Sequence, residues 1–127
     1  MGYYSTMSRC DVVKTEMTKD EFMEKWNQAV EATKGTDDEG YLDFYQWIVG
    51  DEKDGFRWMS IEMDEWYAKH YADEALAKFI SSVVADGGFC LLEFQGEDGA
   101  WWGYYITKQS VKEIEYVRRV DGVVLDV

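Results

Sequence analysis

The chain has 127 residues, and its 26 acidic and 13 basic residues give a formal net charge of −13. Hydrophobic residues make up 46% and aromatic residues 17% of the sequence, which excludes a disordered chain, because disorder goes with few apolar groups. The charge argues against direct binding to nucleic acid or to an anionic membrane, since both need basic side chains to neutralise phosphate. The length predicts a single domain, over residues 1–127, with one core.

The N-terminal sequence and the two cysteines favour a reducing compartment. No basic segment followed by an apolar stretch opens the chain, and no apolar run reaches membrane-spanning length. Cys10 and Cys90 lack the partners of a zinc site, and a disulfide between them is neither implied nor excluded. We therefore expect a cytoplasmic protein with no metal and no cofactor.

A strand and a helix are expected first. Residues 3–15 predict a strand. Thr18 and Glu21 match the capping-box pattern, in which each side chain accepts a hydrogen bond from the other residue's backbone N–H. Gly35 is a suitable end for the helix that Thr18 opens. Apolar residues at helical spacing lie between them: Phe22, Met23, Trp26, Ala29 and Val30.

Two strands and a second helix follow. Residues 41–49 and 56–63 are rich in aromatic and β-branched residues and predict a hairpin whose turn is formed by residues 50–55. Residues 64–70 are ambiguous. Asp73 is the expected N-cap of a helix that ends before Gly87. Its apolar stripe consists of Leu76, Phe79, Ile80, Val83 and Val84.

The last forty residues predict antiparallel strands at 89–94, 101–107 and 111–117, with a further short strand at 123–127. The order is thus β-α-β-β-α-β-β-β. Because two amphipathic helices can cover one face of an antiparallel sheet, the predicted fold class is α+β. The first six elements fit a split βαβ arrangement with an added C-terminal hairpin.

Acidic residues are concentrated in the middle of the chain. Residues 36–75 hold twelve acidic side chains, opposed only by Lys53, Arg57 and Lys69. If the carboxylates converge in space, they should repel polyanions and attract a basic surface. Trp66 and Tyr67 could anchor such a partner through cation–π contacts. The predicted partner-binding residues are Asp37, Asp38, Glu39, Asp51, Glu52, Asp54, Asp64, Glu65, Trp66 and Tyr67.

Catalytic chemistry has little support in the sequence. His70 is the only histidine and could act as a general base, but a residue of this kind lies more often at the surface or at a helix start. The acidic turns 37–40 and 51–55 lack the ligand spacing of a calcium loop. No catalytic residue is predicted, and we expect a protein that is not an enzyme.

Residues 101–105 place large aromatic side chains on both faces of one strand, on either side of Gly103. Either both sheet faces are covered, or one face exposes the aromatic groups. Gly103 would allow a close backbone approach or a bulge. An exposed aromatic face also leaves a homodimer open.

The predicted function is that of a small acidic protein-binding module, an inhibitor that engages the basic, nucleic-acid-binding surface of its target. Two settings fit: a phage-encoded anti-defence protein that mimics nucleic acid, as anti-CRISPR proteins can, or an immunity protein that neutralises a basic toxin. The alternative is a small-ligand binding module whose pocket is lined by the aromatic groups under the C-terminal strands. The sequence does not specify the partner.

Overall fold

The computed structural model describes residues 2–125 and contains two helices, α1 (Lys19–Ala32) and α2 (Asp73–Val83). A five-stranded sheet has the order β5-β1-β6-β7-β8, a three-stranded sheet the order β2-β4-β3, and β9 and β10 form a hairpin. The strands are β1 (Ser5–Cys10), β2 (Val13–Thr15), β3 (Gln46–Lys53), β4 (Phe56–Glu62), β5 (Tyr67–Ala68), β6 (Phe89–Gly96), β7 (Trp101–Thr107), β8 (Ser110–Glu113), β9 (Arg118–Val120) and β10 (Val123–Leu125).

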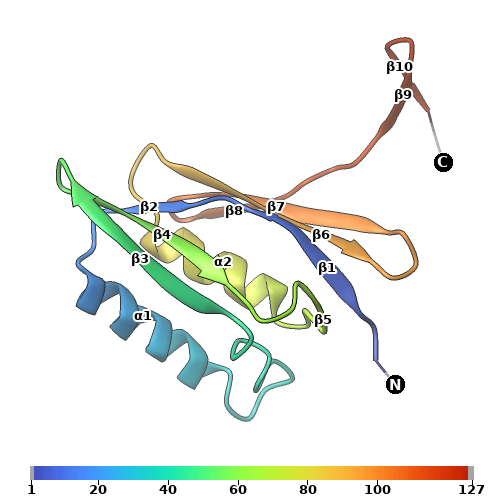
Figure 1. The fold of residues 1–127 in the computed structure, drawn as a ribbon. Helices are drawn as coiled ribbons and strands as arrows, with labels where there is room; N and C mark the ends of the chain where they lie inside the picture. Colours follow the sequence, from blue (N-terminus) through green and yellow to red (C-terminus); the bar gives the residue numbers. More distant parts are fainter. Residues whose placement is uncertain (1, 126–127) are drawn as a thin grey trace.

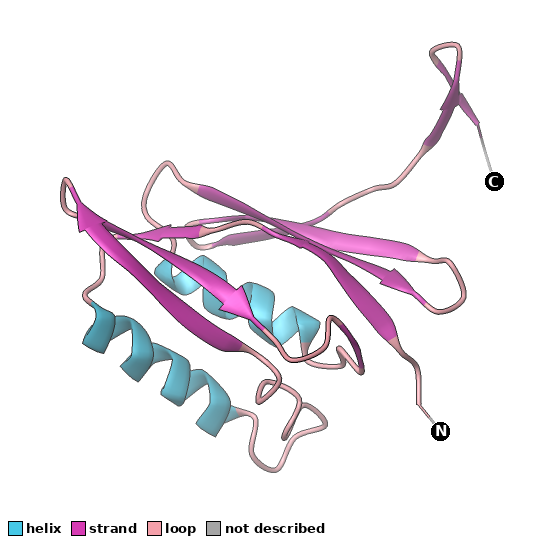
Figure 2. Ribbon diagram, in the orientation of Figure 1, coloured by secondary structure: helices cyan, strands magenta, loops and turns pink. Residues whose placement is uncertain are grey.

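Both helices lie on one face of the two larger sheets (Figures 1 and 2), which confirms the predicted α+β class. Strands β2 and β3 each pair antiparallel with β4, which lies between them, so they run in the same direction and β2-α1-β3 is a split βαβ unit. The N-terminal segment, which holds β1 and β2, therefore has two neighbours. It pairs with β4 through β2 and with β6 through β1. Strands β7 and β8 then add the predicted C-terminal hairpin to β6.

The N-terminal segment forms two strands instead of the single strand expected over residues 3–15, and the break falls at Asp11. The Asp11 backbone N–H donates to the carbonyl of Leu91 at 3.1 Å, and its carboxylate accepts from the Leu91 N–H at 3.0 Å. The same carboxylate accepts from Arg9 Nε at 2.8 Å. The Asp11 carboxylate thus accepts the Leu91 N–H that a backbone carbonyl would accept in a regular strand pair. After Asp11 the backbone leaves β6, and β2 pairs with β4.

Helix α1 confirms the predicted capping box. The Thr18 hydroxyl accepts from the Glu21 N–H at 3.2 Å, and the Glu21 carboxylate accepts from the Thr18 N–H at 3.0 Å. The helix ends at Ala32, and Gly35, three residues beyond, adopts a left-handed φ of 77°.

Helix α2 buries its whole predicted stripe, but Asp73 is not its N-cap. Ala72 occupies that position and makes no side-chain capping bond. The Asp73 carboxylate instead accepts hydrogen bonds from Trp102 Nε1 at 2.9 Å and from the Tyr104 hydroxyl at 2.7 Å. The prediction was wrong because two donors on β7, about thirty residues away, take the carboxylate that would have capped the helix. The stripe residues are Leu76, Phe79, Ile80, Val83 and Val84.

Other element boundaries also differ from the prediction. Residues 41–44 form turns, and β3 continues to Lys53, so the hairpin turn shrinks to Asp54 and Gly55, which have φ values of 54° and 83°. Strand β8 ends at Glu113, four residues before its predicted end. The expected strand at 123–127 corresponds to β10, and residues 126–127 of it lie outside the described residues.

An aromatic cluster holds the helices to the sheet. The ring of Phe79 on α2 lies 5.3 Å from that of Phe22 and 4.8 Å from that of Trp26, both on α1. It also lies 5.7 Å from the ring of Trp47 on β3. These edge-to-face and tilted contacts join α1, α2 and β3 in one core.

Candidate functional site

The predicted acidic residues fall into two groups at different ends of the structure. Asp51, Glu52 and Asp54 lie at the tip of the β3–β4 hairpin. Residues 37–39 lie in the α1–β3 loop, residues 64–66 lie in the connection from β4 to β5, and Tyr67 begins β5, all far from that tip (Figure 1). All eight carboxylates are exposed except that of Asp38, which is half-buried. They therefore do not form one continuous acidic face.

A groove of about 380 Å³ lies between the end of the α1–β3 loop and the β4–β5 connection. We call it the acidic groove. It combines three carboxylates with apolar groups, and no basic residue lines it. Its lining residues are Asp43, Phe44, Gln46, Met63, Asp64, Glu65 and Ala68. Asp64 and Glu65 are thus the predicted site residues that the structure brings into a concave surface.

Asp43 and Phe44 were missed by the sequence reasoning because they fell inside an expected strand over residues 41–49. In the structure they belong to turns that precede β3. Asp43 was one of the twelve acidic residues of the middle segment, so its charge could have suggested it, but nothing local marked its position next to Asp64. Asp37 and Glu39 lie earlier in the same loop, where the Glu39 carboxylate accepts from the Gly35 N–H at 2.9 Å.

The two walls of the acidic groove are joined by a buried histidine. Tyr45, at the end of the α1–β3 loop, hydrogen-bonds through its hydroxyl to His70 Nδ1 at 2.6 Å. His70 Nε2 lies 2.9 Å from the carbonyl of Trp66, which can only accept, so Nε2 carries the proton and Nδ1 accepts from Tyr45. Of the two positions expected for His70, the surface was wrong, because the residue is only 3% exposed, whereas it does lie close to the start of α2 at Asp73. Both ring nitrogens serve to position the chain.

The contribution of His70 to the free energy of unfolding is expected to fall as the pH drops below about 6.5, the ordinary pKa of histidine. Burial lowers the pKa of His70, against weaker opposing effects of the Trp66 carbonyl and of Asp73. A lowered pKa in the folded state means that the unfolded chain binds the proton first, so acid favours unfolding. Urea unfolding followed between pH 7.5 and 5 would measure this loss of free energy.

The control for this prediction is His70→Phe, which keeps a ring at the position and removes the titrating group. Acidification also relieves repulsion within a chain of net charge −13, so the comparison that matters is wild type minus variant at each pH. His70 is the only histidine. If the two proteins change in parallel from pH 7.5 to 5, the prediction is contradicted.

The predicted anchors Trp66 and Tyr67 lie beside the acidic groove. The Trp66 carbonyl accepts from the backbone N–H of Met7 at 3.0 Å, which fixes the main chain while the residue stays 44% exposed. Tyr67 is 48% exposed and stacks on Tyr4, with ring centroids 5.3 Å apart. The ammonium of Lys69 lies 5.6 Å from the Tyr4 ring centroid.

The aromatic strand β7 divides its side chains between the two faces of the sheet. Trp102 stacks on Phe94 at 5.5 Å between centroids, and Tyr104 is 8% exposed, so both pack in the core. Trp101 and Tyr105, on the opposite face, are 47% and 42% exposed. The second of the two arrangements considered from the sequence, an exposed aromatic face, is the one observed.

Within residues 2–125, no cluster of His, Cys, Asp and Glu is arranged to hold a metal ion. Both Cys10 and Cys90 are free thiols. None of the helices described here is long and apolar enough to cross a membrane.

Comparisons with protein-family models, with curated proteins and with solved structures find no match.

Proposed function

We propose that this chain is a small acidic protein-binding module that inhibits its target by offering the acidic groove to a basic, nucleic-acid-binding surface. The observation that carries the proposal is the composition of that groove: Asp43, Asp64 and Glu65 with Phe44 and Met63, and no basic lining residue. The protein would act in the cytoplasm, either as a phage-encoded anti-defence protein or as an immunity protein that neutralises a basic toxin.

An arginine or lysine side chain of the partner fits this chemistry. Such side chains carry an apolar stem and a charged end, so the stem can lie on Phe44 and Met63 while the charge meets the carboxylates. Trp66, next to the groove, offers an exposed indole for a cation–π contact. The net charge of −13 adds long-range attraction to a basic surface, which raises the rate of association and weakens with salt.

Three charge-matched variants separate the groove from bulk charge. Each replaces three acids by lysine: D43K/D64K/E65K in the groove, D37K/D38K/E39K in the preceding loop, and D51K/E52K/D54K at the distant hairpin tip. An arginine-rich peptide serves as the probe, titrated at low and at high salt. We expect the groove triple to weaken binding by about 10- to 100-fold, or roughly 1.4–2.8 kcal/mol, relative to the tip triple. If all three variants weakened binding equally, binding would depend on the overall negative charge and not on the acidic groove.

The inhibitory role needs the natural target. Wild type and the groove triple are immobilised and used to capture proteins from the host lysate at low salt. A basic nucleic-acid enzyme held by the wild type, released by high salt and absent from the groove triple is the expected target. Free wild-type protein should then compete with DNA or RNA for that enzyme. Simultaneous binding of the protein and the nucleic acid would contradict inhibition by occupation of the nucleic-acid channel.

A further inference from the structure

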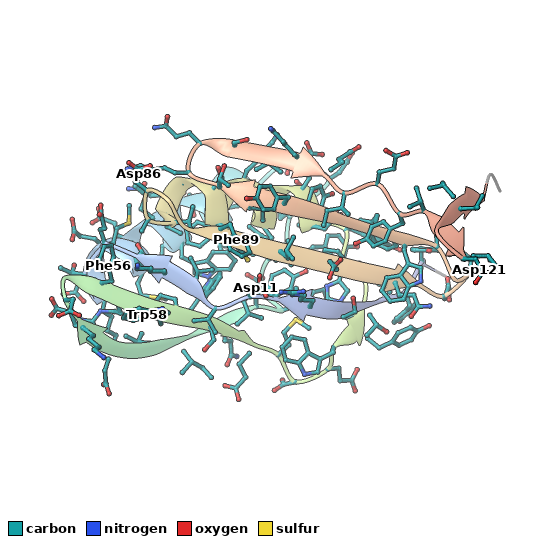
Figure 3. The ribbon with its side chains drawn as sticks, turned by 90° about the horizontal axis from the view of Figure 1, so that it is seen from above. Asp11, Phe56, Trp58, Asp86, Phe89 and Asp121 are labelled. Atoms are coloured by element: carbon teal, nitrogen blue, oxygen red, sulfur yellow. The ribbon has the colours of Figure 1, made fainter. Side chains whose placement is uncertain are left out.

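The sheet face opposite the helices is an exposed apolar surface, which we call the outer face. Figure 3 looks down on it and shows Phe56, Trp58 and Phe89 with no helix or strand lying over them. Except for the half-buried Phe56, its members are 36–52% exposed. The outer face consists of Val12, Ile48, Phe56, Trp58, Phe89, Trp101, Tyr105 and Tyr116.

The charged side chains that make contacts on the outer face are two cations, Arg9 and Lys14, and two anions, Asp11 and Glu93, whereas the chain as a whole is strongly acidic. The ammonium of Lys14 lies 4.0 Å from the centroid of the Phe56 ring. The carboxylate of Asp11 is paired with Arg9 at 2.8 Å. The carboxylate of Glu93 accepts from the Tyr116 hydroxyl at 2.9 Å. A chain of net charge −13 can bury this face against another copy of itself without bringing two acidic surfaces together.

The segment that follows β8 crosses this face at Gly103. A Cβ atom at Gly103 would lie 2.7 Å from the Tyr116 hydroxyl and 2.6 Å from the Leu92 carbonyl. Only glycine therefore leaves room for the Tyr116 side chain to pack over this strand. The close approach that the sequence suggested at Gly103 is therefore present. Tyr116 in turn lies 6.1 Å from the ring of Trp101.

Beyond Tyr116, the β9–β10 hairpin forms an arm that stands clear of the sheets on the side of the outer face (Figure 1). Val120, Val123 and Val124 of this arm, together with Val117 directly before it, are 46–61% exposed. A two-stranded hairpin is at best marginally stable in water without a surface to pack on. Within the described chain, nothing packs on the apolar side chains of this arm. The arm lies on the same side of the molecule as the outer face, so a second copy bound there could cover both.

We propose that two copies of this chain associate through their outer faces, with the arm of each copy lying along the sheet of the other. Aromatic side chains bury about 200 Å² each, and at these exposures the outer face offers roughly 700 Å². Stable dimers bury about 800 Å² per partner, so the exposed valines of the arm supply the remaining area. The same surface patch serves both copies, as a two-fold axis requires.

Salt separates this association from the binding of a basic partner. Each copy carries a net charge of −13, so the two repel one another, and salt that screens this repulsion should strengthen the dimer. Binding of a basic surface by the acidic groove should weaken under the same change. The dimer does not depend on the proposed inhibitory function, and either can fail without the other.

Sedimentation equilibrium over a range of protein concentrations and at two salt concentrations tests the dimer. The wild-type chain should approach twice its monomer mass of 14.8 kDa, with the tighter association at high salt. Tyr105→Lys should raise the dissociation constant at least about tenfold, since it places a charge in the interface. The matched control is Tyr67→Lys, which is similarly exposed but lies outside the outer face, and it should leave the dimer unchanged.

Val123→Asp on the arm provides a second variant that leaves the sheet intact, and it should weaken the dimer by a similar factor. A wild type that stays monomeric at every concentration and salt would overturn the proposal. So would a dimer that dissociates equally with Tyr67→Lys, a dimer that weakens as salt is added, or an open-ended series of larger assemblies.

Discussion

Replacing Phe79 by alanine is expected to lower the free energy of unfolding by about 3–5 kcal/mol. Phe79 is 4% exposed, and its ring contacts those of Phe22, Trp26 and Trp47. The substitution removes apolar burial and leaves a cavity where α1, α2 and β3 meet, which the surrounding side chains can fill only in part. Because the free energy of unfolding of a small domain is only about 5–15 kcal/mol, this substitution should remove a large part of it. Denaturant unfolding followed by circular dichroism measures it.

The control for this prediction is Phe89→Ala, which deletes the same atoms from a side chain that is 52% exposed on the outer face. At protein concentrations low enough to keep the chain monomeric, it should cost less than about 1 kcal/mol. A Phe79→Ala variant no less stable than Phe89→Ala would show that the aromatic cluster does not hold the helices on the sheet.

Replacing Asp73 by alanine is expected to lower the free energy of unfolding by about 2–4 kcal/mol. Its carboxylate accepts from both Trp102 Nε1 and the Tyr104 hydroxyl, and Tyr104 is 8% exposed. Hydrogen bonds to a charged acceptor contribute about 1.5–3 kcal/mol each, and a buried donor left without an acceptor keeps its full desolvation cost. Burial and the bond to Asp73 raise the pKa of Tyr104, so the hydroxyl remains a donor at neutral pH. Denaturant unfolding at pH 7 provides the measurement.

Glu74→Ala is the matched control, since it removes the same charge from the same helical turn. Glu74 makes an exposed ion pair with Lys78 at 3.4 Å, and its loss should cost less than about 1 kcal/mol. Asp73→Asn keeps an acceptor oxygen and should fall between the two alanine variants. If Asp73→Ala and Glu74→Ala were equally stable, the carboxylate would act only through the helix dipole.

Asp73 also shows where prediction from sequence ends. Its position before an apolar stripe is typical of an N-cap, yet its partners are Trp102 and Tyr104, on a strand that follows the helix. Asp11 behaves in the same way, because its carboxylate meets Leu91, eighty residues away, and divides one expected strand into two. In both cases the carboxylate accepts hydrogen bonds from donors far along the chain, which no local pattern indicates.

The candidate site was predictable in composition but not in shape. The excess of acid in residues 36–75 is plain in the sequence, and it contains Asp64, Glu65 and the neighbouring Trp66. That Asp43 and Phe44 would complete a groove with them, while Asp51, Glu52 and Asp54 would lie at a distant hairpin tip, depends on how the α1–β3 loop packs on the β4–β5 connection. The Tyr45–His70 hydrogen bond that joins these segments has no sequence signature.

The sequence by itself determined the two helices, the α+β class and the acidic character of the chain. These follow from patterns among near neighbours in the chain, such as the capping box of Thr18 and Glu21 and the helical spacing of the apolar stripe of α2. The tertiary structure alone decided which carboxylates share a groove, that His70 is buried, and that the aromatic outer face stays uncovered. Each of these depends on contacts between segments far apart in the chain, and such contacts form only when the whole core has packed.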